Sequence, residues 1–269
     1  MKANPRFKKY HLWVSNHQKL FLVLIIGSLC ALGTWEMLQL QAPIWCIILV
    51  DLVIYFSGFI VAAFSNIKLT TLAVTEMCKT CDPILLWEEL ERQLSLTKSE
   101  QQQQMLTIDK CRAALYLGEY DQALNILNSI NIDQFKNTLP FQKVAYYNNL
   151  CAAYTNLDLL EQADACYRKQ VEIYDGIKKE TQKKGLHHFM EAARASALYR
   201  GREYTAAIEL FSALPSNTLM EQVLAAFSIA KCHLALDQKD EAREWLRFVV
   251  ENGNKLAVVQ EANNLLEQL

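Results

Sequence analysis

The residues whose types and spacing most clearly could carry out chemistry are Cys78 and Cys81, three positions apart in the stretch VTEMCKTCDP. A C-x-x-C pair can supply half of a zinc site, act as a thioredoxin-like redox pair, or consist of two small side chains that pack together. A zinc site needs four ligands, and no second C-x-x-C or H-x-x-x-H follows. A thioredoxin-like pair follows a strand, and no strand pattern is visible. We therefore expect two reduced side chains at a helix junction, without metal or cofactor.

No other stretch carries the signature of an enzyme. The sequence contains no G-x-S-x-G, no Gly-rich phosphate loop and no H-E-x-x-H zinc motif. His187 and His188 follow the basic stretch KKETQKKG, which favours a solvated surface, and His233 is expected at a core or boundary position. The formal net charge of −2 lacks the excess of positive charge that is typical of nucleic-acid-binding proteins. We therefore predict a protein that is not an enzyme and does not bind nucleic acid.

Composition favours an all-α fold in a reducing compartment. Only 8 glycines and 5 prolines occur in 269 residues, too few for the many tight turns of a sheet-rich chain. Ala, Leu, Gln, Glu and Lys, which are good helix formers, dominate after residue 85. The 8 cysteines are scattered, and a chain of this length has no need of disulfide staples. We expect them to be reduced and to pack as small hydrophobic side chains.

Two apolar runs near the N-terminus predict a membrane hairpin. Residues 20–35 carry no charge, and residues 44–64 carry a single one, Asp51. A helix of roughly 20 apolar residues crosses a bilayer, and the connection EMLQLQAP is too short for a domain. A cleaved signal peptide is the competing interpretation of the first run. The hairpin is favoured because no A-x-A site follows that run and a second apolar run comes at once.

Lysine and arginine predict the orientation of this hairpin. Five of them precede the first run, none lies in the connection, and Lys68 and Lys79 follow the second run. Because positive charge stays on the cytoplasmic side, both termini are expected in the cytoplasm, with the protein in the plasma or inner membrane. Asp51 is an intramembrane polar site. We expect it to face Ser28, Thr34 or a second copy of the hairpin, in a packing role rather than in transport.

The C-terminal part contains a repeated pattern of small and large residues. Its copies read CRAALYLGEYDQALNILNSI, CAAYTNLDLLEQADACYRKQ, ASALYRGREYTAAIELFSAL and AKCHLALDQKDEAREWLRFV. Each copy starts with a small residue, has an alanine twelve positions later, and has a large residue four positions beyond that. The alanines are Ala123, Ala163, Ala207 and Ala242. Two antiparallel helices in close contact need such small residues where they meet and large residues beside them.

This pattern resembles the tetratricopeptide repeat (TPR), a helix–turn–helix unit of about 34 residues that stacks into a solenoid. YYNNLCAAY (146–154) matches the first helix of the unit, and GEYDQAL (118–124) and GREYTAAI (201–208) match its turn and second helix. The resemblance covers about 104–252. The alanines lie 40, 44 and 35 residues apart, so two of the units carry insertions.

The flanks of the repeat predict a joint and a closing helix. Asp82 is expected to cap a helix that has Pro83 at its first position. Residues 252–269 predict a turn, Asn254 as N-cap and an amphipathic closing helix, as the end of a solenoid requires. Lys110 and Arg194 depart from the pattern, because the family has a large apolar residue at their positions.

The resemblance also implies a binding face. TPR arrays hold partner segments on a concave face that is lined mainly by first helices. The positions that this transfers to the present chain are Arg112, Tyr116, Asn148, Asn156, Tyr199, Arg200 and Lys231. Cations and asparagines beside aromatic rings would hold a peptide with acidic groups. Ile108 stands where the family's clamp for chaperone C-termini has its first lysine, so a co-chaperone role is not expected.

Together these features predict a two-helix transmembrane hairpin followed by a TPR-like α-solenoid of about four helix pairs and a C-terminal capping helix. The expected parts are a basic N-terminus (1–19), the hairpin (20–65), juxtamembrane and capping helices (66–98) and the repeat domain (99–269). We expect a membrane-tethered adaptor that binds a protein or peptide partner. The alternatives are a non-catalytic subunit of a membrane transport or envelope-synthesis complex that works through the hairpin and Asp51, and a redox or metal module built on the C-x-x-C pair.

Overall fold

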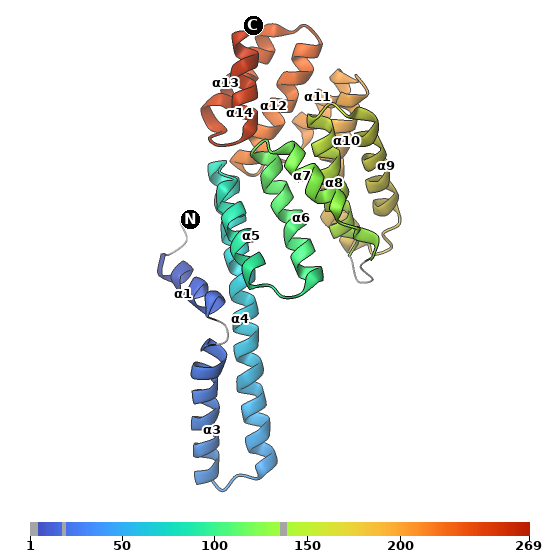
Figure 1. Ribbon diagram of the computed structural model, residues 1–269. Coiled ribbons are helices and arrows are strands. Elements are labelled where there is room, and N and C mark those ends of the chain that lie inside the picture. The colour runs from blue at the N-terminus through green and yellow to red at the C-terminus, as the bar shows by residue number, and fades with distance from the viewer. Residues whose placement is uncertain (1–4, 18–19, 135–138) are drawn as a thin grey trace. The chain divides into compact units, whose positions relative to one another are not determined.

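The protein is helical throughout the residues that the structure describes, which are 5–17, 20–134 and 139–269 (Figure 1). These residues form helices and turns and contain no strand, so the all-α class expected from the composition is confirmed. The computed structural model divides into two compact units, Met1–Ala73 and Val74–Leu269. The boundary lies inside helix α4 (Ile44–Thr80).

The first unit contains α1 (Pro5–Asn16), the π-helix η1 (Phe21–Ile26), α3 (Gly27–Gln39) and the larger part of α4. The π-helix continues directly into α3, which packs against α4. A Cβ on Gly58 would lie 2.4 Å from the side chain of Ile26, so only glycine permits this approach. Thr34 Oγ1 donates a hydrogen bond of 2.8 Å to Asp51 Oδ2 across the same contact. Asp51 thus contacts Thr34, one of the residues that it was expected to face, and a contact with a second copy of the hairpin stays a prediction.

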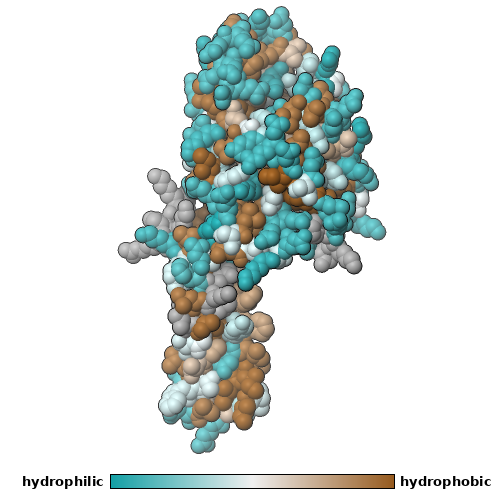
Figure 2. Space-filling view, viewed as in Figure 1, coloured by the Kyte–Doolittle hydropathy of each residue, from teal (hydrophilic) through white to brown (hydrophobic). Residues whose placement is uncertain are grey.

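Helix α4 is the one described helix that is long and apolar enough to cross a membrane by length and composition. Its 37 residues correspond to roughly 55 Å, which exceeds a hydrocarbon core of about 30 Å. Large apolar side chains such as Phe56, Phe59 and Ile60 are exposed on its surface, and Figure 2 shows hydrophobic atoms gathered on this part of the molecule. The first apolar run is helical but is split between η1 and the 13-residue α3, so a second span stays a prediction.

The second unit is a series of helices, each packed on its neighbours. It begins with the end of α4 and contains α5 (Ile84–Leu96), α6 (Glu100–Tyr116), α7 (Tyr120–Ser129), η2 (Ile132–Gln134), α8 (Pro140–Asn156), α9 (Leu160–Asp175), α10 (Glu180–Arg200), α11 (Tyr204–Ala213), α12 (Leu219–Ala235), α13 (Lys239–Asn252) and α14 (Ala257–Glu267). The pairs α6–α7, α8–α9, α10–α11 and α12–α13 correspond to the four copies of the repeated pattern. Helix α14 packs on α13 and α12.

The four pairs share one turn geometry. The residue five positions before each repeat alanine has a positive φ of 58–84°. These residues are Gly118, Asp158, Arg202 and Asp237. In each turn the next N–H donates to the carbonyl five residues earlier at 2.8–3.0 Å, which ends the first helix with satisfied carbonyl groups. Only one of the four positions is glycine, so the four turns share a positive φ and not a residue type.

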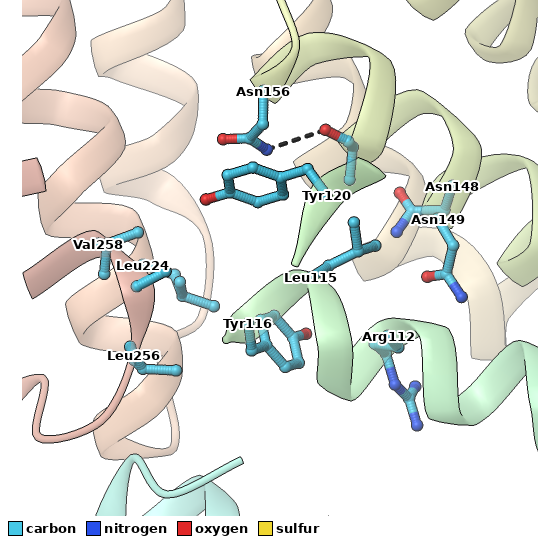
Figure 3. A pocket seen from close by; sticks show the side chains of 12 residues that line it. Arg112, Leu115, Tyr116, Tyr120, Asn148, Asn149, Asn156, Leu224, Leu256 and Val258 are labelled. Atoms are coloured by element: carbon cyan, nitrogen blue, oxygen red, sulfur yellow. Dashed lines mark hydrogen bonds between the residues drawn. The ribbon is translucent and has the colours of Figure 1, made fainter. Parts of the chain in front are cut away.

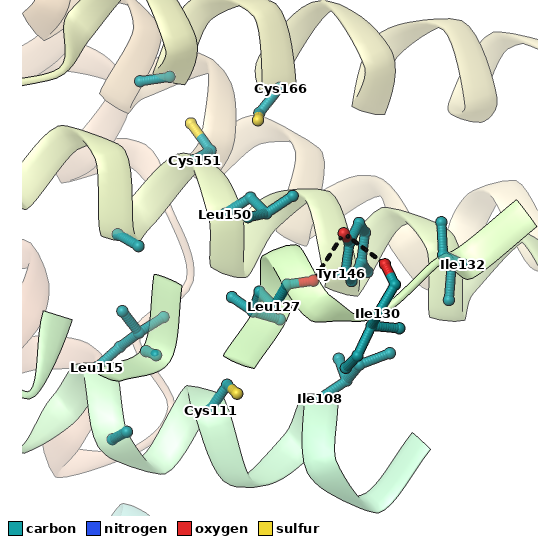
Figure 4. Close-up of a cluster of buried hydrophobic side chains, with 14 residues drawn as sticks. Ile108, Cys111, Leu115, Leu127, Ile130, Ile132, Tyr146, Leu150, Cys151 and Cys166 are labelled. Atoms are coloured by element: carbon teal, nitrogen blue, oxygen red, sulfur yellow. Dashed lines mark hydrogen bonds between the residues drawn. The ribbon is translucent and has the colours of Figure 1, made fainter. Parts of the chain in front are cut away.

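The alanine that follows each turn is fully buried. Ala123, Ala163, Ala207 and Ala242 have no exposed surface, although they lie in four different pairs. A buried cluster surrounds the first two of them and joins α6, α7, α8 and α9 (Figure 4). Within it the Tyr146 hydroxyl lies 3.0 Å from the Leu127 carbonyl oxygen and 3.1 Å from that of Ile130, so the end of α7 is fixed by α8.

Lys110, which departs from the TPR pattern, is accommodated by the first helices of the unit. Its ammonium group lies 4.1 Å from the centroid of the Trp87 ring and 2.8 Å from a carboxylate oxygen of Glu91. The aliphatic stem and the charge of a lysine can thus replace a large apolar side chain when an aromatic ring and a carboxylate face it.

The turn before α14 differs from its prediction. Helix α14 begins at Ala257 with Leu256 as N-cap, so the expectation that Asn254 caps it is wrong. Asn254 instead has φ +48° and donates its side-chain amide to the Thr80 carbonyl at 2.7 Å. Lys255 Nζ lies 2.7 Å from Asp82 Oδ2, and its N–H donates to the Cys81 carbonyl at 3.2 Å. The turn that precedes the last helix therefore binds the joint between α4 and α5. We call these contacts the closing contact.

Replacing a repeat alanine tests the close packing of a helix pair. We expect Ala163→Leu to lower the free energy of unfolding by about 1–3 kcal/mol, because a buried methyl site in a packed interface cannot accept three more carbons without strain. Ala165→Leu, on the exposed face of the same helix, is the matched control and should change stability by less than about 0.5 kcal/mol. Urea denaturation of the full chain, followed by circular dichroism, measures both. Equal stabilities of the two variants would contradict the packing argument.

A candidate partner-binding cleft

A cleft of about 150 Å³ lies between two walls of the second unit. One wall comes from α6 and α8 and the other from α12, α14 and the residue before α14 (Figure 3). The volume is below the roughly 300–1,000 Å³ of a typical small-molecule or cofactor site. The cleft therefore suits one or two side chains of another chain better than a whole cofactor.

The wall formed by α6 and α8 is polar. Arg112 Nη2 lies 3.3 Å from Asp109 Oδ1, while its buried Nε has no hydrogen-bond partner among the described residues. Asn148 likewise makes no side-chain hydrogen bond within the described part of the chain, whereas Asn156 bonds back to the Ala152 carbonyl at 2.8 Å. This wall thus offers donor groups to a ligand, with a guanidinium at one end.

The opposite wall is apolar. Leu224 comes from α12, Leu256 precedes α14, and Val258 lies in its first turn (Figure 3). A Cβ on Gly118 would approach the Ala257 side chain to 3.0 Å, so the start of α14 lies tightly against the turn between α6 and α7. A ligand in the cleft would meet aliphatic groups on one side and donors on the other.

Four of the seven predicted concave-face residues line this cleft together: Arg112, Tyr116, Asn148 and Asn156. Tyr199 and Lys231 lie outside it but contact one another, with the ammonium group 5.7 Å from the ring centroid. Lys231 also pairs with Glu261 of α14 at 3.2 Å. Lys231 therefore links α12 to α14.

Arg200 has a different environment from the one that the repeat register implied. Its side chain is 1% exposed, and its Nε donates a hydrogen bond of 2.8 Å to Asp164. The guanidinium also lies near the Tyr167 ring, at 5.9 Å from the centroid. Arg200 thus ties α10 to α9 and has no surface to offer to a partner.

Sequence reasoning missed the apolar wall. Tyr120, Leu224, Leu256 and Val258 line the cleft, and three of them come from α12 or from the start of the closing helix. The positions transferred from the repeat do not include Leu224, although it lies on the first helix α12, and α14 lies outside the repeat. Leu256, the apolar residue that follows the turn NGNK (252–255), is the sequence signal that could have indicated a contact at the start of the closing helix.

The C-x-x-C pair lies at the end of α4, where its side chains are buried or partly buried. Cys81 is fully buried with φ +53°, and Cys78 is partly buried. Burial raises the pKa of both thiols, and for Cys78 the nearby Glu221 raises the pKa further while Arg112 lowers it. All 8 cysteines are free. In the described ranges no three or more His, Cys, Asp or Glu side chains are grouped so that they could hold a metal ion.

Comparison with known proteins adds no relative: no protein-family model, no curated protein and no solved structure matches this chain.

The buried thiols predict a dependence of stability on pH. Burial raises the pKa of Cys111 to about 12 from an ordinary value of 9.0. Between these values the native chain keeps a proton that the unfolded chain has lost, so the free energy of unfolding falls as the pH rises above 9. We expect Cys111→Ala to lose less stability than the wild type between about pH 8 and 10.5, as measured by urea denaturation. Identical pH dependence in both proteins would contradict this.

Proposed function

We propose that this protein is a membrane-tethered adaptor whose cleft holds a short segment of a partner protein. The observation that carries the proposal is the convergence of Arg112, Tyr116, Asn148 and Asn156 on one cleft with an apolar opposite wall. These four belong to the seven positions that the TPR resemblance implies for a binding face, and their common place in one cleft supports the proposal.

The composition of the two walls supports a particular kind of segment. Leu224, Leu256 and Val258 favour an aliphatic side chain. Arg112, with an unpaired Nε, and the Asn148 amide favour a carboxylate next to it. A partner segment with an acidic residue beside an aliphatic one would satisfy both walls.

A TPR-like solenoid is the fold that we propose for the second unit. It is supported by four helix pairs with one turn geometry and by a fully buried alanine at the same place in each pair. Solenoids of this kind present long surfaces that are made of neighbouring repeats, which suits a role in binding other proteins.

The first unit is proposed as the tether, with two membrane spans, residues 20–39 and the apolar part of α4. Trp35 and Trp45 are exposed on either side of the connection, where an aromatic belt would place them. The distribution of lysine and arginine favours both termini in the cytoplasm. Tethering raises the local concentration of a partner, so a cleft of modest affinity would suffice.

The contacts of Asp51 favour a role in helix packing over a role in transport. Its Oδ2 accepts the hydrogen bond from Thr34, while Oδ1 is buried and has no partner among the described residues. Cys30 Sγ lies 3.5 Å from the Asp51 carbonyl oxygen in the same contact. A carboxyl group enclosed between two helices of its own chain is a poor start for an ion pathway.

Photo-crosslinking tests the adaptor function. We expect a photoreactive phenylalanine derivative at Asn156, which is exposed beside the cleft, to form a covalent adduct with a partner in the native cell. The matched control is the same derivative at Arg168, which is exposed on α9 and does not line the cleft. Adducts of equal yield at both positions would contradict a cleft-specific partner.

Substitutions in the two walls sharpen this test. Arg112→Gln and Leu224→Asp should each lower the adduct yield at Asn156 at least fivefold, since each removes about 1–3 kcal/mol of favourable contact. Arg194→Gln removes a 61% exposed guanidinium on α10 and should leave the yield unchanged.

A truncated chain separates the adaptor from the alternative function. A chain that lacks residues 1–66 should still bind the partner once purified. Complete loss of binding would favour the alternative in which the hairpin is the working part.

A further inference from the structure

The N-terminal segment has one sign of charge. The first acidic residue of the chain is Glu36, and five basic residues precede it: Lys2, Arg6, Lys8, Lys9 and Lys19. Helix α1 lies within this segment and has no acidic residue in its first turn or elsewhere. A short helix with only positive charge attracts anionic surfaces and repels basic ones.

Helix α1 is attached to the end of the apolar part of α4. Val14 and Ser15 are buried, and the Ser15 hydroxyl donates to the side-chain oxygen of Asn66. Val14 belongs to a cluster that includes Phe21 and Ile26 and is packed against Val61. Asn66 lies two residues after the apolar run of residues 44–64, so α1 lies beside the level at which that run ends.

The other face of α1 presents aromatic and cationic side chains. Tyr10 is 49% exposed and Trp13 is 40% exposed, and Lys9 beside them is exposed as well. Lys68 lies two residues after Asn66, and its ammonium group is 5.4 Å from the centroid of the Phe64 ring. Amphipathic aromatic rings next to lysines are the side chains found at the headgroup level of a bilayer.

We propose that Lys9, Tyr10, Trp13 and Lys68 form a binding site for the headgroups of anionic phospholipids. The site rests on the proposed tether, because an α4 that spans the membrane places these residues at the cytoplasmic surface. The two rings lie among the headgroups, and the two ammonium groups bind phosphate oxygens. Each such cation raises the affinity for an anionic surface by roughly fivefold.

A lipid surface fits this face better than an acidic protein. Phe64, which is 47% exposed and belongs to the exposed apolar surface of α4, lies under the Lys68 ammonium group, so the patch adjoins a surface that acyl chains would cover if α4 spans the membrane. A protein partner would have to bind the cations while leaving this apolar surface to the bilayer.

Competition between two lipids tests the site. The full chain in detergent micelles is mixed with equal amounts of phosphatidylglycerol and phosphatidylcholine, and bound lipid is counted by native mass spectrometry. We expect the wild type to prefer phosphatidylglycerol and the double variant Lys9→Gln/Lys68→Gln to lower the ratio of the two lipids by roughly 5- to 25-fold. The matched control, Lys178→Gln/Lys184→Gln, removes two exposed lysines of the second unit and should leave the ratio unchanged.

Three results would overturn the proposal: no preference in the wild type, an unchanged ratio in the double variant, or an equal fall in the control. Raising the salt concentration from about 0.05 to 0.5 M should also reduce the preference of the wild type, a measurement that needs no variant. Extraction of native membranes with alkaline carbonate separates this inference from the tether. A chain released by carbonate overturns both, whereas a chain retained in the membrane without lipid preference overturns the headgroup site alone.

Discussion

The second unit depends on close contact between paired helices, which a methyl-sized side chain at each repeat position permits. Each alanine follows its turn by five residues, and the left-handed residue in the turn sets the direction in which the second helix leaves. A larger side chain at the alanine would separate the pair and displace the large residues one turn further on. The positive φ angles of 58–84° at Gly118, Asp158, Arg202 and Asp237 show that different side chains satisfy the same constraint.

The cleft is a product of this packing and of the closing contact together. First helices α6 and α8 supply its polar wall, while the turn at Asn254 and Lys255 positions the start of α14 as its apolar wall. The pair between Lys231 and Glu261 fixes the same helix further along. The cleft thus lies between two first helices of the repeat on one side and α12 with the start of α14 on the other.

Local features could be predicted from the sequence, and features that depend on distant contacts could not. The turns and buried alanines are encoded within about fifteen residues, so their spacing was sufficient. Asn254 is a good N-cap by local preference, yet its amide bonds to Thr80, 174 residues away. Arg200 has the register of a face residue, but Asp164 pairs with its side chain on the neighbouring helix. The apolar wall was missed for the same reason, since α14 has no counterpart in the repeat.

The closing contact also has a consequence for the order of assembly. A linear array of helix pairs can fold from its first pair onward while the chain is still being made, because each pair needs only its neighbour. Here Leu256 and Val258 complete a surface that begins at Arg112, and the turn that positions them binds residues next to the start of the unit. The cleft is therefore incomplete in a nascent chain until α14 has been synthesised and has packed against α12 and α13.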